Sequence, residues 1–173
     1  MSNLLIQAIG FIGMGLYVGS YQFKNNRRLF IMQVFSYLFY LVHFLLLGAL
    51  TGSASVFVNL VRSILLSSNW KWARGRCACS VLCIIQIILT AVTWEGCISL
   101  LPCIGNLATT IGGYTHNPRK IRVSIMAFNA PLWLIYDIII GSWAAVSDEI
   151  ITELSGLISI IRYGWKELDE RQE

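Results

Sequence analysis

Seven apolar runs, each 18 to 22 residues long, follow one another through nearly the whole chain. They span residues 3–21, 29–50, 53–70, 77–94, 97–114, 121–140 and 148–165. Runs of about 17 to 25 apolar residues can cross a bilayer as helices, which satisfy their backbone hydrogen bonds internally. The chain is 56% hydrophobic and 13% charged, against about 25% charged in soluble domains. The sequence therefore predicts an all-α polytopic membrane protein with seven transmembrane helices and no soluble domain.

Basic residues cluster after alternate runs. Twelve of the 13 follow runs one, three, five and seven, namely Lys24, Arg27, Arg28, Lys71, Arg74, Arg76, Arg119, Lys120, Arg122, Arg162, Lys166 and Arg171. The other connections hold Glu95, Asp148 and Glu149 and no basic residue. Because Lys and Arg are retained on the cytoplasmic side of short loops, this pattern predicts an outer N-terminus and a cytoplasmic C-terminus. It gives no support to nucleic-acid binding, since the charges lie in juxtamembrane loops.

The chain also resembles itself, because residues 10–72 align with residues 103–165 at a constant spacing of 93 positions. Identical pairs include Tyr21 and Tyr114, Phe35 and Phe128, Leu41 and Leu134, Gly48 and Gly141, and Trp72 and Trp165. In both copies a Gly-rich apolar segment ends in a basic run, a long apolar segment ends in Gly, and a third ends in aromatic residues. This pattern predicts a duplicated three-helix unit.

The predicted topology and the repeat constrain each other. Runs one to three and five to seven both begin outside, so the copies are parallel, and the fourth run reverses the chain between them. This predicts a 3-1-3 arrangement, with triple-helix repeats at 1–76 and 96–166, an inverting linker helix at 77–95 and a cytoplasmic tail at 167–173. Parallel repeats of this kind are related by an axis along the membrane normal, and their interface is the expected place for a site.

Residues of the sixth run resemble a known family. Asn129, Trp133 and Tyr136 form an N-x-x-x-W-x-x-Y string similar to the second helix of a SWEET or PQ-loop triple-helix unit, and Pro102 lies where that superfamily usually has proline. Over its full length the chain resembles the YgjV-type bacterial inner-membrane protein family, which is grouped with the SWEET and PQ-loop (MtN3-like) proteins. The resemblance implies alternating access to a small polar solute, with an aromatic residue and an asparagine from each half lining a central pocket.

Carried over to this chain, the resemblance puts the pocket tryptophan at Trp133, with Tyr40 as its repeat mate. The position of the pocket asparagine falls on Glu149 and Val56 at the usual family spacing, and on Thr152 and Asn59 if the outer turn is three residues longer. In the second alignment only Asn59 keeps the amide side chain.

Besides the charges assigned above to the connections and run ends, four ionisable residues lie within the predicted runs, namely His43, Arg62, Asp137 and Glu153. Such groups usually face the interior of a bundle or a water-filled cavity. Arg62, expected midway along its run, either binds the negative part of a solute or forms a structural pair with Asp137 or Glu153. His43 either couples proton movement to transport or packs as a hydrogen-bonded histidine near the outer interface. Asp137 lies near the outer end of its run, where simple solvation is an alternative.

Cysteine and histidine usage predicts no cofactor and no metal site. Three of the five cysteines start the fourth run on the predicted cytoplasmic side, whereas Cys97 and Cys103 lie toward the outside, so the two groups cannot meet; two histidines cannot form a His-rich site. The chain contains no phosphate-binding loop, nucleophile elbow, zinc-protease motif or paired catalytic carboxylates. An enzyme is therefore not expected.

Two functions from different classes remain. In the first, the protein is a SWEET-like facilitator or secondary transporter that moves a small polar or anionic metabolite across the bacterial inner membrane. Its solute site would comprise Tyr40, His43, Asn59, Arg62, Asn129, Trp133, Tyr136, Thr152 and Glu153. In the second, it is a non-transporting scaffold or receptor of the PQ-loop type. The expected partners are the lipid bilayer and a small solute, with proton coupling and a homodimer left open. A polar pocket between the halves favours the first function, and a tightly packed interior favours the second.

Overall fold

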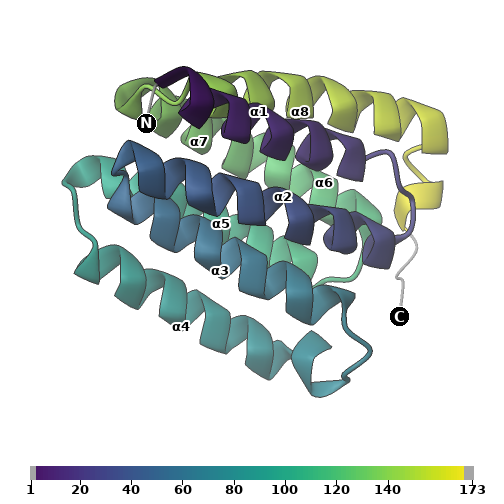
Figure 1. Cartoon of the computed structure of the whole chain (residues 1–173). Helices are drawn as coiled ribbons and strands as arrows, with labels where there is room; N and C mark the ends of the chain where they lie inside the picture. The colour runs from purple at the N-terminus through teal and green to yellow at the C-terminus, as the bar shows by residue number, and fades with distance from the viewer. Residues whose placement is uncertain (1–2, 170–173) are drawn as a thin grey trace.

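The protein, described as a computed structural model over residues 3–169, is helical throughout that range and contains no strand there (Figure 1). The α-helices are α1 (Asn3–Ser20), α2 (Asn26–Leu47), α3 (Leu50–Ser67), α4 (Arg76–Val92), α5 (Leu100–Gly113), α6 (Pro118–Ser124), α7 (Ala130–Ile140) and α8 (Trp143–Tyr163). A π-helical turn, Ile125–Asn129, joins α6 and α7 into one continuous rod. Short 3-10 turns lie at Trp72–Arg74, Cys97–Ser99 and Glu167–Asp169. Seven helical rods therefore occupy the seven predicted runs.

The surface and the interior have the polarity of a membrane protein. Within residues 3–169, four rods are long and apolar enough to cross a bilayer, namely α1, α2, α3 and the α6–α7 rod. The helix α4 and the segment Cys97–Gly113 are apolar but shorter. Large apolar side chains such as Leu4 and Ile161 are exposed, whereas polar ones such as Ser36 and Asn106 are fully buried. Such an apolar surface is suited to lipid rather than water.

Capping residues determine where the helices begin and end. The Asn25 side chain accepts a hydrogen bond from a backbone N–H of α2, and the Asn117 side chain caps α6 in the same way. Gly48 and Gly141 end α2 and α7 in the left-handed conformation, with φ of 75° and 71°, which glycine adopts without strain.

These caps shift two helices relative to the predicted runs. The helix α3 begins at Leu50 instead of residue 53, and α8 begins at Trp143 instead of residue 148. Asp148 and Glu149, which the sequence placed in the outer connection, consequently lie more than one turn inside α8 and are buried. The loop prediction for these two acids is therefore wrong, because α7 ends at Ile140 as predicted but α8 begins only three residues later, at Trp143.

Six of the rods pack in a ring. The helix α2 lies between α1 and α3, and the α6–α7 rod lies between α5 and α8. The ring closes where α1 packs against α8 and α3 packs against α5. The helix α4 packs against α3 and α5 and lies at the edge of the bundle (Figure 1). Each junction therefore joins the first helix of one group of three to the last helix of the other.

The two groups bury equivalent positions. Each residue buried in α8 lies 93 positions after a residue buried in α3. The α3 set is Thr51, Gly52, Ser55, Val56, Asn59, Arg62, Ser63 and Leu66, and the α8 set is Ala144, Ala145, Asp148, Glu149, Thr152, Ser155, Gly156 and Ser159. Equivalent helices thus turn the same face toward the interior.

The middle rods follow the same rule with one change of register. The capping residues Asn25 and Asn117 are 92 positions apart, whereas Gly48 and Gly141 are 93 apart. The additional residue of the second rod is taken up by the π-helical turn, since a π-turn accommodates one residue more than regular helix. The loop before it is one residue shorter, which hides the change from an ungapped alignment.

Candidate functional site

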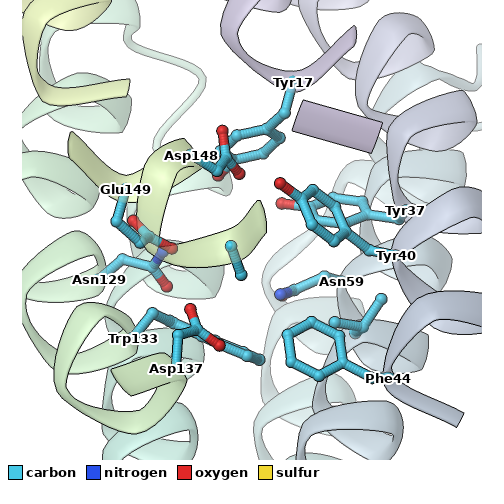
Figure 2. A pocket seen from close by; sticks show the side chains of 12 residues that line it. Tyr17, Tyr37, Tyr40, Phe44, Asn59, Asn129, Trp133, Asp137, Asp148 and Glu149 are labelled. Carbon is cyan, nitrogen blue, oxygen red and sulfur yellow. The ribbon is translucent and has the colours of Figure 1, made fainter. Parts of the chain in front are cut away.

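A cavity of about 30 Å³ lies between the two groups of helices (Figure 2). This volume is enough for on the order of two water molecules. Its lining residues are Tyr17, Tyr37, Tyr40, Phe44, Val56, Asn59, Asn129, Trp133, Asp137, Ala145, Asp148 and Glu149. The lining contains three carboxyl groups and two amides but no Lys, Arg or His.

One side of the cavity, here called the acidic wall, consists of Asp137 from α7 and Asp148 and Glu149 from α8. Neither carboxyl oxygen of Asp137 has a hydrogen-bond partner, and Oε2 of Glu149 has none either. Oδ1 of Asp148 accepts a hydrogen bond of 3.1 Å from the Thr152 hydroxyl. No ion pair recorded within residues 3–169 involves the acidic wall. Since uncompensated buried charge is costly, these groups need protons or a cation.

The opposite side, here called the aromatic wall, consists of Tyr17 from α1 and Tyr37, Tyr40 and Phe44 from α2. Its rings pack in two pairs, with centroids 5.5 Å apart between Tyr17 and Tyr37 and 6.1 Å apart between Tyr40 and Phe44. The ring centroid of Trp133 lies 5.7 Å from that of Phe44, and Trp133 connects the two walls. Figure 2 shows the two walls facing each other across the cavity.

The amide of Asn106 positions two groups of the lining. Its Oδ1 accepts hydrogen bonds from Nδ2 of Asn59 at 3.0 Å and from Nε1 of Trp133 at 3.1 Å. Its own Nδ2 donates to Oε1 of Gln86 at 3.1 Å, which ties the network to α4. The Oδ1 atoms of Asn59 and Asn129 are buried without partners. The cavity therefore presents acceptors that nothing in the described chain satisfies.

Arg62 lies behind the aromatic wall and does not line the cavity. Its Nη2 donates to the Tyr37 hydroxyl at 3.2 Å, and its Nη1 donates to Thr109 Oγ1 at 2.6 Å. These hydroxyl partners stand in place of the expected pairs with Asp137 or Glu153. Arg62 also lies about one turn past the middle of α3, because α3 begins and ends three residues earlier than the predicted run.

His43 and Tyr136 lie beyond the cavity, toward the ends of α2 and α7. His43 Nδ1 donates to the Ile6 carbonyl, and its Nε2 pairs with the Ser142 hydroxyl, both at 2.8 Å. The Tyr136 hydroxyl accepts from the Gly52 N–H at 2.9 Å. Both side chains therefore connect helices at this end of the bundle.

Glu153 faces a second, larger space between α7 and α8, a groove of about 530 Å³. The groove is lined mostly by apolar side chains, and Glu149 contributes to both the groove and the central cavity. One carboxyl oxygen of Glu153 has no partner.

The structure thus brings together four of the nine predicted site residues in the cavity lining, namely Tyr40, Asn59, Asn129 and Trp133. Thr152 reaches the site through Asp148. The remaining four, His43, Arg62, Tyr136 and Glu153, lie outside the lining.

Sequence reasoning missed Asp148, Glu149, Tyr17 and Tyr37 as site residues. It considered Asp137 only as a partner of Arg62 or as a solvated group. A signal for the acids was present, since Asp148, Thr152, Ser155 and Ser159 recur at three- and four-residue intervals and form one polar helix face. The seventh predicted run began at Asp148, which put the first acids of this polar face at the helix end and so concealed the face.

Comparison with known proteins identifies the family but no characterised relative. The family Imp-YgjV, described as bacterial inner membrane protein, matches residues 4–167. No curated protein and no solved structure matches the chain. The family match covers nearly the whole chain and agrees with its apolar helices and exposed apolar surface. The chain therefore belongs to the Imp-YgjV family of bacterial inner membrane proteins.

Proposed function

We propose that this protein moves a small polar solute across the bacterial inner membrane by alternating access, through the cavity between its two groups of helices. The observation that carries the proposal is the set of buried, unpartnered acceptors of Asp137, Asn59 and Asn129 that line one cavity. Buried polar groups in proteins are normally hydrogen-bonded. Several exceptions around a single space are expected where a ligand supplies the missing partners.

The proposed architecture is the SWEET-like 3-1-3 plan, with α1–α3 and α5–α8 as parallel halves and α4 as the inverting helix. Two features support it. The junctions of α1 with α8 and α3 with α5 are those that a two-fold axis along the membrane normal would produce. The matched burial of α3 and α8 is expected of duplicated units. In this proposal all seven rods cross the membrane, with the N-terminus outside.

The solute is proposed to be cationic or neutral, in place of the anionic option. The lining carries three carboxyl groups and no basic side chain. Arg62 was the residue that suggested an anionic solute, but its guanidinium donates hydrogen bonds to the hydroxyls of Tyr37 and Thr109. We assign solute contact to Tyr40, Asn59, Asn129 and Trp133 together with the acidic wall, and structural roles to His43, Arg62 and Tyr136. Neither catalysis nor nucleic-acid binding forms part of this proposal.

The alternative is a non-transporting scaffold or receptor, and the small volume of the cavity favours it. A transporter would have the same small cavity volume in a conformation in which the solute site is closed to both sides of the membrane. Both ends of the bundle carry contacts suited to gates, such as Tyr136 with Gly52 at one end and Arg122 with the Tyr21 carbonyl at the other. Alternating access requires these contacts to open in turn.

Cysteine accessibility tests the proposal without knowledge of the solute. Val56 lines the cavity, whereas Val58 in the same helix is equally buried but does not line it. In a variant whose native cysteines are replaced, Val56→Cys should react with a water-soluble methanethiosulfonate both in cells and in inside-out vesicles. Val58→Cys should stay protected from both sides. Protection of both positions from both sides would refute the transport pathway and favour the scaffold.

A further inference from the structure

The two walls of the central cavity differ in chemistry because they come from different halves of the chain. Phe44 and Asp137 occupy equivalent positions 93 residues apart, and Val56 and Glu149 are related in the same way. In each pair the first half supplies an apolar side chain and the second half supplies a carboxyl group. The cavity is therefore asymmetric, with carboxyl groups on one side and aromatic faces on the other.

We propose that this cavity binds the ammonium group of a small organic cation, held between the acidic wall and the aromatic wall. The inference rests on the proposed function and names the class of its solute. An ammonium group carries three N–H donors and no acceptor. The cavity offers matching acceptors in the oxygens of Asp137 and in the Oδ1 atoms of Asn59 and Asn129, all buried and otherwise unpartnered.

The aromatic wall distinguishes an organic ammonium from an inorganic ion. A cation placed within about 6 Å of an aromatic face is attracted by the ring, most strongly when it is desolvated. Tyr37, Tyr40 and Phe44 surround the side opposite the carboxyl groups (Figure 2). A metal ion instead requires several oxygen ligands converging on one point. No group of three or more His, Cys, Asp or Glu within residues 3–169 is arranged to hold one.

The size of the cavity limits the cation in this conformation. A volume of about 30 Å³ admits an ammonium or methylammonium group but excludes a bulky quaternary amine. Charge balance points the same way, because no Lys, Arg or His lines the cavity beside the three carboxyl groups. A bound ammonium group would supply both the missing charge and the missing donors.

Thermal unfolding of the purified full-length protein in detergent tests the inference, with methylammonium chloride as the probe. Methylammonium should raise the Tm in a saturable manner, beyond the effect of equal concentrations of sodium or potassium chloride. Asp137→Asn should weaken the apparent affinity by about tenfold or more. Glu167→Gln, which changes an exposed carboxyl at the surface, should behave as the wild type. If Asp137→Asn does not fold, Asp148→Asn takes its place with the same expectation.

Three results would overturn the ammonium site: no stabilisation by methylammonium, equal stabilisation by sodium, or an affinity unchanged in the wall variant. Cysteine accessibility separates this failure from failure of transport. If Val56→Cys reacts from both sides while methylammonium has no effect, the pathway stands and the cationic solute is rejected. If methylammonium binds while Val56→Cys stays protected, the ammonium site stands and transport is rejected.

Discussion

Asp137 is the least compensated buried side chain in the cavity. It is 0% exposed and neither of its oxygens has a partner, whereas its repeat mate Phe44 needs none. Removing the charge of an unpaired buried group is often neutral or stabilising, because the cost of desolvating that charge no longer opposes folding. Such a group is retained at a cost in stability, which is common where function requires it.

The substitution Asp137→Asn should therefore stabilise the empty protein by about 1 to 3 kcal/mol while impairing ligand binding. Thermal unfolding without added amine measures the first effect. Asp169→Asn provides the control, since Asp169 pairs with Arg119 near the surface and its loss should be neutral or mildly destabilising. A marked loss of stability in Asp137→Asn would contradict the uncompensated state of this carboxyl group, and the ammonium site would then be tested with Asp148→Asn.

Arg122 is the opposite case, a buried charge with several partners. The sequence counted it among the loop residues that orient the chain, yet it lies in α6 and is 0% exposed. Its guanidinium donates to the Ser159 hydroxyl and to the carbonyls of Pro118, Tyr21 and Phe23, at 2.9 to 3.2 Å. It thereby connects the α1–α2 loop to the second group of helices.

Replacing Arg122 with alanine should cost about 3 to 5 kcal/mol, because buried carbonyls lose their donors and a large side chain leaves a void. The control Arg28→Ala removes an exposed arginine of α2 and should change stability by less than about 0.5 kcal/mol. Chemical denaturation and the yield of monodisperse protein measure both. Equal effects of the two substitutions would contradict the proposed connection.

The π-helical turn distinguishes the α6–α7 rod from its counterpart in the first half, α2. Pro131 follows the turn and lacks the N–H that would bond to the carbonyl of Ala127 in a regular helix. Its counterpart in α2 is Leu38, which keeps the N–H. The turn also carries Asn129, which lines the cavity and whose side-chain Oδ1 has no hydrogen-bond partner. Helix irregularity and the candidate site thus coincide, as π-turns often do with functional positions.

Deleting Ala127 together with Pro131→Leu should convert the rod into a regular helix and leave the protein folded. The two ends of the rod keep their positions, since the turn holds only the one additional residue. The matched deletion of Phe35 in α2 removes a residue that is not additional, so it rotates the rest of that helix by about 100° and should abolish folding. Expression and size-exclusion profiles compare the two. Failure of both deletions alike would argue against the one-residue register change.

Helices were more predictable than their ends. Each apolar run contains a rod, because apolar length decides whether a segment suits a bilayer. The connections before α3 and α8 are short, and their hydrophobicity differs little from that of the flanking runs. The predicted starts of these two helices were therefore wrong by three and five residues. That error alone moved Asp148 and Glu149 out of the predicted site. The contacts of Arg62 and His43 depend on how helices rotate and pack, which a single sequence does not specify.

At the scale of the whole molecule, the number of membrane crossings is the most consequential prediction left to test. Four rods meet the length and hydropathy expected of a membrane span, whereas α4 and the segment Cys97–Gly113 are shorter. The basic clusters after α3 and α5 share one side if α4 and α5 both cross the membrane, and equally if both lie flat on the cytoplasmic side, so the charge pattern alone does not decide between the two. The exposed thiols of Cys77 and Cys97 lie at opposite ends of α4 and can decide the matter.

Variants that retain only Cys77 or only Cys97 should differ in their reaction with a membrane-impermeant maleimide. In cells with a permeabilised outer membrane, Cys97 should be labelled and Cys77 should not, while disruption of the inner membrane should expose both. If α4 and α5 lay flat on one side, the two thiols would report the same side in every preparation. Labelling of Cys77 alone would keep the crossing but invert the chain. Opposite sidedness with Cys97 outside is required if two parallel halves are to share one central cavity with an outer N-terminus.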